Sequence, residues 1–135
     1  MDAAEAVVAD VGARVLVADD DLSIRLLIED ILEQSGYRVE LAEDGRDALR
    51  RVRQNPPDLI ITDLVMPDMD GTELIRTLSK SNPDIPVLAM SGGRSETQVY
   101  MRIAEVLGAR ALILKPFDID VLLQSVANCL ACPKP

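Results

Sequence analysis

Residues 58–62 have the sequence Asp-Leu-Ile-Ile-Thr, a short apolar run that is followed directly by an acid, Asp63. Similar runs occur at 14–18 (RVLVA), 86–90 (PVLAM) and 109–114 (ARALIL), and a more alternating run lies at 37–41 (YRVEL). Near-continuous apolar runs of this length are typical of strands buried on both faces of a parallel sheet. These five runs are therefore predicted to be strands, and they decide the fold class.

Stretches with the apolar spacing of a helix follow each of these runs. They lie at 24–32, about 45–54, 72–79, 99–107 and 119–130, and glycine, Asn-Pro or Pro-Pro ends the first four. A strand–helix alternation repeated five times with short connections predicts an α/β fold. We expect a doubly wound, five-stranded parallel sheet with about five flanking helices and the order 2-1-3-4-5, one of the two common orders of such sheets.

The length and charge of the chain limit the classes of protein to which it can belong. It has 135 residues, 14 basic and 23 acidic, and a formal net charge of −9. This length suits a single domain, which we place at residues 13–131 between tails at 1–12 and 132–135. The acidic balance argues against direct nucleic-acid binding, and no apolar stretch approaches the roughly 20 residues of a membrane helix. Because the first residues also lack the basic start of a signal peptide, we expect a soluble, cytoplasmic protein.

Histidine and cysteine limit the chemistry. The chain has no histidine, which excludes histidine-based catalysis and histidine-ligated metals. Cys129 and Cys132 form a lone C-x-x-C near the end of the sequence. We expect this pair to be incidental, because structural zinc takes four ligands and a redox C-x-x-C stands at the start of a helix that follows a strand.

Polar residues follow four of the predicted strands, at the edge where ligands bind in such sheets. Two carboxylates about 4 Å apart repel by about 4 kcal/mol at an effective dielectric of ~20, so acids gathered there need a counter-charge. Mg²⁺ prefers oxygen ligands and works beside phosphate, while an ammonium and a hydroxyl suit a phosphoryl group. We therefore predict a site that holds a phosphoryl group on a carboxylate, built from Asp19, Asp20, Asp21, Asp63, Ser91 and Lys115.

Each of these residues also has a purely structural interpretation. The acids at 19–21 are suited to capping the first helix, a role for which Ser23 competes. Asp63 precedes a turn signalled by Asp70-Gly71, and Ser91 and Lys115 suit a loop and a solvated strand end. Their joint occurrence at the ends of strands favours the functional interpretation.

Roughly residues 13–130 resemble the receiver domain of two-component response regulators. The resemblance rests on VLVADDD at 15–21, DLIITDLVMPDMDG at 58–71, PVLAMSG at 86–92 and KPF at 115–117. It implies a flavodoxin-like fold, a phosphorylated aspartate and a Mg²⁺ ion beside it. Carried over to this chain, it implies Asp63 as the phosphorylation site, Asp19, Asp20, Asp63 and the backbone carbonyl of Val65 as metal ligands, Ser91 and Lys115 as phosphoryl contacts, and a cis Lys115–Pro116 bond.

The same resemblance implies a function in phosphorelay signalling. The donor would be a phosphohistidine on a histidine kinase or a histidine phosphotransfer protein, since this chain has no histidine. The domain would assist its own phosphorylation and dephosphorylation without being an enzyme with a separate catalytic domain. Phosphorylation would bias the face formed by 99–107, 109–114 and 119–130 toward a downstream protein, with a homodimer possible. Tyr100, Met101 and Arg102 are candidate contacts there, although the first two equally suit packing along the helix.

Three positions depart from the pattern of the family. Leu112 stands where an aromatic ring usually accompanies the hydroxyl of the switch, so the aromatic part of the switch is missing. Val65 and Gly93 occupy positions that tune attack of water on the phosphoaspartate, and neither offers a polar side chain. We expect slow or ordinary self-hydrolysis, which phosphate release over time would measure.

Three other classes compete with this interpretation. The main alternative is a pseudo-receiver that binds partners without phosphorylation, against which the complete set of site residues argues. The Asp-x-Asp at 19–21 resembles the first part of the motif of haloacid-type hydrolases, but the next element of that motif and a cap domain are missing. A flavin mononucleotide binder would need a Ser/Thr-rich loop where this chain has three acids.

Overall fold

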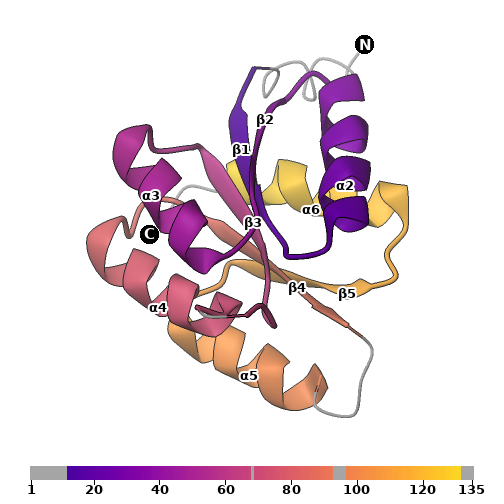
Figure 1. Cartoon of the computed structure of the whole chain (residues 1–135). Coiled ribbons are helices and arrows are strands. Elements are labelled where there is room, and N and C mark those ends of the chain that lie inside the picture. The colour runs from indigo at the N-terminus through magenta and orange to yellow at the C-terminus, as the bar shows by residue number, and fades with distance from the viewer. Residues whose placement is uncertain (1–11, 68, 93–96, 132–135) are drawn as a thin grey trace.

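The computed structural model describes residues 12–67, 69–92 and 97–131, except for the side chains of 97, 98, 100 and 101. In these segments strands and helices alternate along the chain (Figure 1). The elements are β1 (Arg14–Ala18), α2 (Leu22–Gln34), β2 (Arg38–Ala42), α3 (Gly45–Gln54), β3 (Leu59–Asp63), α4 (Gly71–Ser81), β4 (Val87–Gly92), α5 (Thr97–Leu107), β5 (Ala111–Lys115) and α6 (Ile119–Ala131).

The sheet has the predicted topology. Its five strands are all parallel and lie in the order β2-β1-β3-β4-β5, which confirms the fold class. Strands β2 to β5 begin one or two residues later than predicted. They also end later, because the ladder pairs Asp63 with Met90 and Gly92 with Lys115. Asp63 and Lys115 are thus the last residues of their strands and Ser91 is the second to last of β4, and the ladder fixes the backbone of all three.

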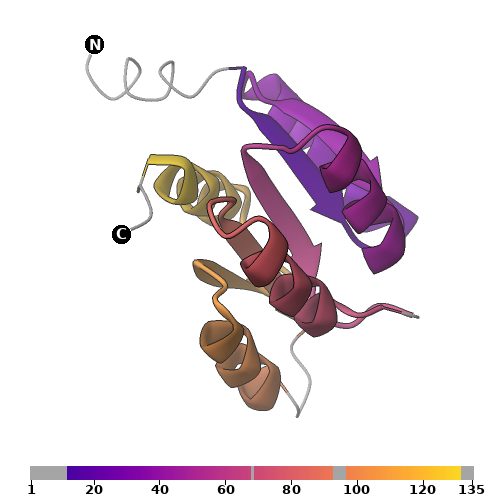
Figure 2. The same ribbon diagram turned by 90° about the vertical axis from the view of Figure 1, so that its left-hand side faces the viewer.

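Two helical layers cover the sheet on opposite faces (Figures 1 and 2). Helices α3, α4 and α5 bury apolar side chains against one face, which we call the α3–α5 layer. Helices α2 and α6 cover the other face, the α2/α6 layer. The central strands β1, β3 and β4 are almost wholly buried between the layers, whereas β2 and β5 at the edges are partly exposed.

Helix ends follow the signals in the sequence. Gly36 and Gly108 have φ angles of 95° and 108° where α2 and α5 end, a backbone conformation that glycine adopts at little cost. Asn55 ends α3 before two prolines. The connections are consequently short, and they return the chain each time to the edge where the next strand begins.

Part of the predicted organisation falls outside the described residues. Of the predicted tail 1–12, the structure describes Gly12, whose N–H donates to the Gly36 carbonyl at 2.9 Å. The tail 132–135, and with it Cys132, is not among the described residues, while Cys129 is buried on α6. Among the helices that are described, none has the length and apolar character needed to cross a membrane.

Candidate functional site

The first acid of the predicted site, Asp19, directly follows β1 and is fully buried. Its N–H donates to the Ala42 carbonyl at 3.3 Å, which extends the β1–β2 ladder by one step. One carboxylate oxygen, Oδ1, accepts the N–H of Asp21 at 2.9 Å, and the other accepts a hydrogen bond from Lys115. Asp19 is therefore held through both its backbone and its carboxylate.

Lys115 joins two strands of the sheet through one ammonium group. It is the last residue of β5, and its Nζ donates to Asp19 Oδ2 at 2.7 Å and to Asp63 Oδ2 at 3.1 Å. The lysine side chain is 18% exposed and that of Asp63 is 11% exposed, so solvent screens these pairs only weakly. The chain residues at 19, 63 and 115, far apart in sequence, thus meet at the carboxyl edge of the sheet.

The three consecutive acids have different roles. Asp21 is the N-cap of α2, and its Oδ1 accepts the N–H groups of Ser23 and Ile24 at 2.9 and 3.4 Å. The capping interpretation is therefore right for Asp21, and Ser23 does not take that role. The next acid back, Asp20, is exposed and belongs with Asp19 and Asp63 in the acidic cluster.

Ser91 lies at the same edge of the sheet, but its side chain points toward the α3–α5 layer. Side chains alternate along a strand, and in β4 Ala89 packs into the α3–α5 layer while Met90 packs into the α2/α6 layer. Ser91 therefore points toward the α3–α5 side. It is buried, and its hydroxyl donates to the Gly92 carbonyl at 3.4 Å. The described residues form a hydrogen-bonded group of Asp19, Asp63 and Lys115 from which the Ser91 hydroxyl is absent.

Burial and charge shift two pKa values in this group. Burial raises the pKa of Asp63, and the carboxylate of Asp19 adds to this, while Lys115 opposes it. Burial by itself lowers the pKa of Lys115, but the hydrogen bond to Asp19 and the charges of Asp63 and Asp19 outweigh it, so that the pKa is raised. The ammonium group is thus strongly held in its charged form between two carboxylates.

The acidic cluster suits a hard divalent ion. One carboxylate oxygen from each of Asp19, Asp20 and Asp63 lies within 4.8 Å of the others. Ligands about 2.1 Å from Mg²⁺ are at most about 4.2 Å apart, so small side-chain adjustments close the set. All three donors are oxygens, which Mg²⁺ prefers, and the exposed carboxylate of Asp20 leaves the cluster open to solvent. The residues present fit Mg²⁺.

The loop after β3 is packed tightly against the site. The N–H of Gly71, the first residue of α4, donates to the Leu64 carbonyl at 3.0 Å, and a Cβ added to Gly71 would lie 2.1 Å from the carbonyl oxygen of Asp63. This position requires glycine. Within the loop, the N–H of Val65 donates to Asp63 Oδ1 at 3.4 Å. The Val65 carbonyl as a metal ligand stays a prediction, as do the roles of Ser91 and Gly93, and Gly93 lies outside the described residues.

Comparison with known families decides the classification. The family model of the response regulator receiver domain matches residues 15–127. The chain belongs to this family. Receiver domains are not dedicated enzymes; they act as phosphoacceptors in two-component signalling, they bind Mg²⁺ at an acidic pocket, and they interact with histidine kinases.

Relatives of this receiver domain include longer regulators. The DNA-binding transcriptional regulator NtrC of Rhizobium meliloti (strain 1021) is 37% identical over 123 residues, which are 91% of this chain and 25% of the relative. The response regulator MprA of Mycolicibacterium vanbaalenii is 38% identical over 111 residues, 82% of this chain and 47% of that protein. The chain thus spans between a quarter and about half of the length of these curated relatives.

Solved structures agree with the fold. The chemotaxis protein CheY4 of Vibrio cholerae superposes with a TM-score of 0.81 at 31% identity, over 88% of this chain and 99% of that one. NtrX from Brucella abortus, solved in complex with ADP, gives a TM-score of 0.83 at 30% identity over 89% of this receiver and 27% of NtrX. The flavodoxin-like fold and the receiver family are both confirmed.

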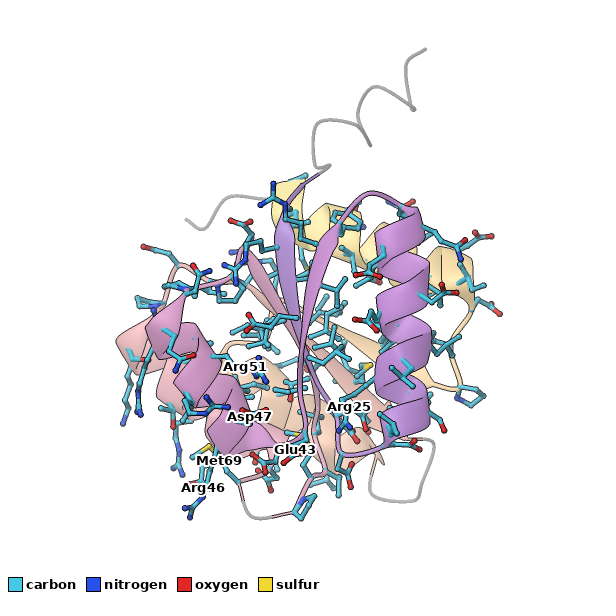
Figure 3. The ribbon with its side chains drawn as sticks, turned by 45° about the horizontal axis from the view of Figure 1, so that its top comes forward. Arg25, Glu43, Arg46, Asp47, Arg51 and Met69 are labelled. Atoms are coloured by element: carbon cyan, nitrogen blue, oxygen red, sulfur yellow. The ribbon has the colours of Figure 1, made fainter. Side chains whose placement is uncertain are left out.

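Sequence analysis missed one contact at the site and one feature farther from it. Arg25 of α2 donates to the backbone carbonyl of Asp19 at 2.7 Å. It lies three and seven residues before the buried Ile28 and Leu32, beside the apolar stripe of the helix, but this spacing does not signal the contact. A chain of ion pairs also ties α3 to the sheet. Arg51 pairs with Asp47 of its own helix (Figure 3). It also pairs with Glu40 of β2, which in turn pairs with Arg14 of β1. Residues with i,i+4 spacing signal the Asp47–Arg51 pair alone.

Proposed function

We propose that Asp63 is the phosphoacceptor of this receiver domain and that Lys115, Asp19 and Asp20 prepare it for the reaction. The observation that carries the proposal is the ammonium of Lys115 placed 3.1 Å from Asp63 Oδ2 and 2.7 Å from Asp19 Oδ2. This arrangement holds a nucleophilic carboxylate beside a cation suited to phosphoryl oxygens.

The transfer needs one bond to form and one to break. An oxygen of Asp63 attacks the phosphorus of a phosphohistidine on a histidine kinase or a phosphotransfer protein. The phosphorus–nitrogen bond breaks, its electron pair stays on the departing imidazole nitrogen, and an acyl phosphate remains on Asp63. Because these 135 residues contain no histidine, the phosphohistidine lies outside them, or the donor is a small phosphoryl compound.

The surrounding residues have distinct tasks in this step. Lys115 binds the incoming phosphoryl oxygens and keeps the product close to a fixed positive charge. Asp19, Asp20, Asp63 and the Val65 carbonyl would hold Mg²⁺, which supplies positive charge against the phosphoryl oxygens when it is bound. Ser91 is positioned one step along the neighbouring strand, where a short movement of its hydroxyl brings a donor to the phosphoryl group.

Exposed aliphatic side chains support the expected output face. Exposed aliphatic side chains lie on all three of its elements, and Val106 of α5 reaches 81% exposure. The members are Val99, Ile103 and Val106 on α5, Leu114 on β5, and Ile119 and Val121 on α6. Exposed apolar residues gathered on neighbouring elements mark protein interaction sites. We propose that a downstream protein, or a second receiver, contacts this face; the side chains of Tyr100 and Met101 lie outside those described.

Phosphorylation can be tested directly by mass spectrometry. The protein is incubated with acetyl phosphate and Mg²⁺, and the intact mass is followed. Wild type should gain one phosphoryl group, whereas D63N should gain none. Asp84, an exposed acid beyond α4, provides the matched control, and D84N should react like wild type. A wild type that stays unmodified with acetyl phosphate and with phosphorylated kinases would favour the pseudo-receiver instead, and modification that survives in D63N would assign the reaction to another residue.

A further inference from the structure

Arg25 reaches back from the first turns of α2 to the acidic cluster. Its Nη1 donates to the backbone carbonyl of Asp19 at 2.7 Å, across six residues of sequence. The residue is partly buried, and Figure 3 shows its side chain directed toward the strand ends rather than away from the sheet. A guanidinium group usually pairs with a carboxylate. Arg25 instead binds a backbone carbonyl although three carboxylates lie nearby, which indicates a specific role for this bond.

The carbonyl that Arg25 binds belongs to the peptide group between Asp19 and Asp20. The peptide group on the other side of Asp19 is fixed by the hydrogen bond from its N–H to Ala42. The Asp19 carboxylate is fixed by Asp21 and Lys115. Arg25 therefore supplies the restraint that those bonds leave open, the orientation of the Asp19–Asp20 peptide plane. This plane determines where the exposed carboxylate of Asp20 lies relative to that of Asp19, because a peptide group is rigid.

We propose that Arg25 is a positioning residue of the magnesium site, which fixes the Asp19–Asp20 peptide plane and so holds the two carboxylates in register for the ion. The inference rests on the proposed metal-binding role of Asp19 and Asp20. Fixing the backbone of one residue has a cost in conformational entropy. In the wild type, Arg25 fixes the Asp19–Asp20 peptide plane before the ion binds. Without Arg25 the ion has to fix this plane itself, so Mg²⁺ binding should weaken by about tenfold.

A purely electrostatic effect of Arg25 on the site makes the opposite prediction. An arginine that is simply a positive charge near an acidic cluster repels a divalent cation, so its removal should tighten Mg²⁺ binding. A positioning residue that is removed should weaken Mg²⁺ binding in spite of that lost repulsion. The sign of the change in affinity therefore separates the two interpretations.

The experiment compares R25M with R53M and R25K in the full chain. R25M keeps much of the apolar stem but removes the donors, and R53M removes the same charge from an exposed residue in the last turn of α3. R25K keeps a charge and a donor. Two readouts are measured: the Mg²⁺ dissociation constant by isothermal titration calorimetry, and the ¹³C resonance of the Asp19 carbonyl in the metal-free protein by NMR. A carbonyl carbon that loses a hydrogen bond moves upfield.

The expected result is that both readouts change together. R25M should bind Mg²⁺ about tenfold more weakly and show the upfield shift, R53M should show neither change, and in R25K recovery of the resonance should accompany recovery of affinity. Affinity in R25M that equals or exceeds that of R53M overturns the inference, as does an unchanged Asp19 resonance or a resonance that recovers in R25K without affinity. If R25M does not fold, R25K applies the same criterion. A wild type that binds no Mg²⁺ would instead refute the proposed metal site, while the resonance would still test the bond from Arg25.

Discussion

Replacing Lys115 with methionine tests the electrostatic design of the site. K115M keeps an unbranched apolar stem of similar length but removes the ammonium group between Asp19 and Asp63. Those two carboxylates are almost wholly buried, so they cannot turn to solvent for compensation. We expect a substantial loss of stability at neutral pH in the absence of Mg²⁺.

The size of the loss follows from the two contacts. At 2.7 and 3.1 Å, and at an effective dielectric of ~20, the Coulomb energies of Lys115 with Asp19 and Asp63 are about 6 and 5 kcal/mol. Removal of the lysine also relieves its own desolvation, which is several kcal/mol for a buried ion. The net cost of breaking such a buried pair is about 3–5 kcal/mol. That is a large part of the 5–15 kcal/mol that stabilise a typical domain.

The pH dependence has a defined sign. Lys115 has a raised pKa, so its contribution is complete below about 10.4, the value in the unfolded chain, and is fully present at pH 7.5. Burial raises the pKa of Asp63, so its ionisation costs stability as the pH rises from about 3.9 through its folded value. In K115M the opposing effect of the lysine is lost. The variant should therefore recover stability as the pH is lowered from 7.5 toward 5, as Asp63 takes up a proton.

Urea unfolding followed by circular dichroism at 222 nm measures these changes, with EDTA present. Lys80, exposed near the end of α4, gives the control K80M, which should change the stability by less than about 0.5 kcal/mol. The double variant D63N/K115M should regain part of the loss, since one of the two uncompensated charges is gone. A K115M within 1 kcal/mol of wild type at pH 7.5, or a loss that is the same at pH 5 and unchanged by D63N, would show that this reasoning is wrong.

Three further substitutions separate metal binding, capping and packing. D20N should weaken Mg²⁺ binding about tenfold in calorimetry and leave urea unfolding nearly unchanged, because Asp20 is exposed; equal Mg²⁺ affinity would remove Asp20 from the site. D21A should lower the stability by about 1 kcal/mol through loss of the N-cap and leave Mg²⁺ affinity unchanged. Weaker Mg²⁺ binding with unchanged stability in D21A would assign Asp21, in place of Asp20, to the metal site. G71A should cost about 3 kcal/mol or more in urea unfolding because its Cβ meets the Asp63 carbonyl, while G92A, whose Cβ meets nothing within 4 Å, should cost far less; equal losses would contradict the close packing.

The sequence was informative about the fold because apolar patterns report burial. The continuous run at 58–62 predicted a buried strand, and β3 at 59–63 is wholly buried. The partly polar run at 37–41 corresponds to the edge strand β2 at 38–42. Parallel strands place their carboxyl ends at one edge, so the convergence of Asp19, Asp63 and Lys115 could also be predicted. The strand boundaries could not be predicted, because a backbone ladder accepts polar residues such as Asp63 and Ser91 as readily as apolar ones.

Other features depend on directions in space, which no pattern reports. Three consecutive acids give the same signal at 19, 20 and 21, yet one is buried, one is exposed and one caps α2. Arg25 looks like an ordinary polar helix residue until the turn after β1 brings the Asp19 carbonyl within its reach. Such roles are set by the geometry of the β1–α2 turn, which has no counterpart in composition or periodicity.

The direction in which Ser91 points suits transmission of the phosphorylation signal to the proposed output face without the usual aromatic residue. Leu112 packs against the same α3–α5 layer toward which Ser91 points, and that layer contains the fully buried Ala104 of α5. In the ladder, Ser91 also pairs with Leu114, whose side chain is exposed on the proposed output face. A movement of the Ser91 hydroxyl toward Asp63 withdraws it from this layer, and a close-packed layer responds by shifting the neighbouring side chains. We therefore expect aliphatic packing between β5 and α5, rather than rotation of a ring, to transmit the signal in this receiver domain.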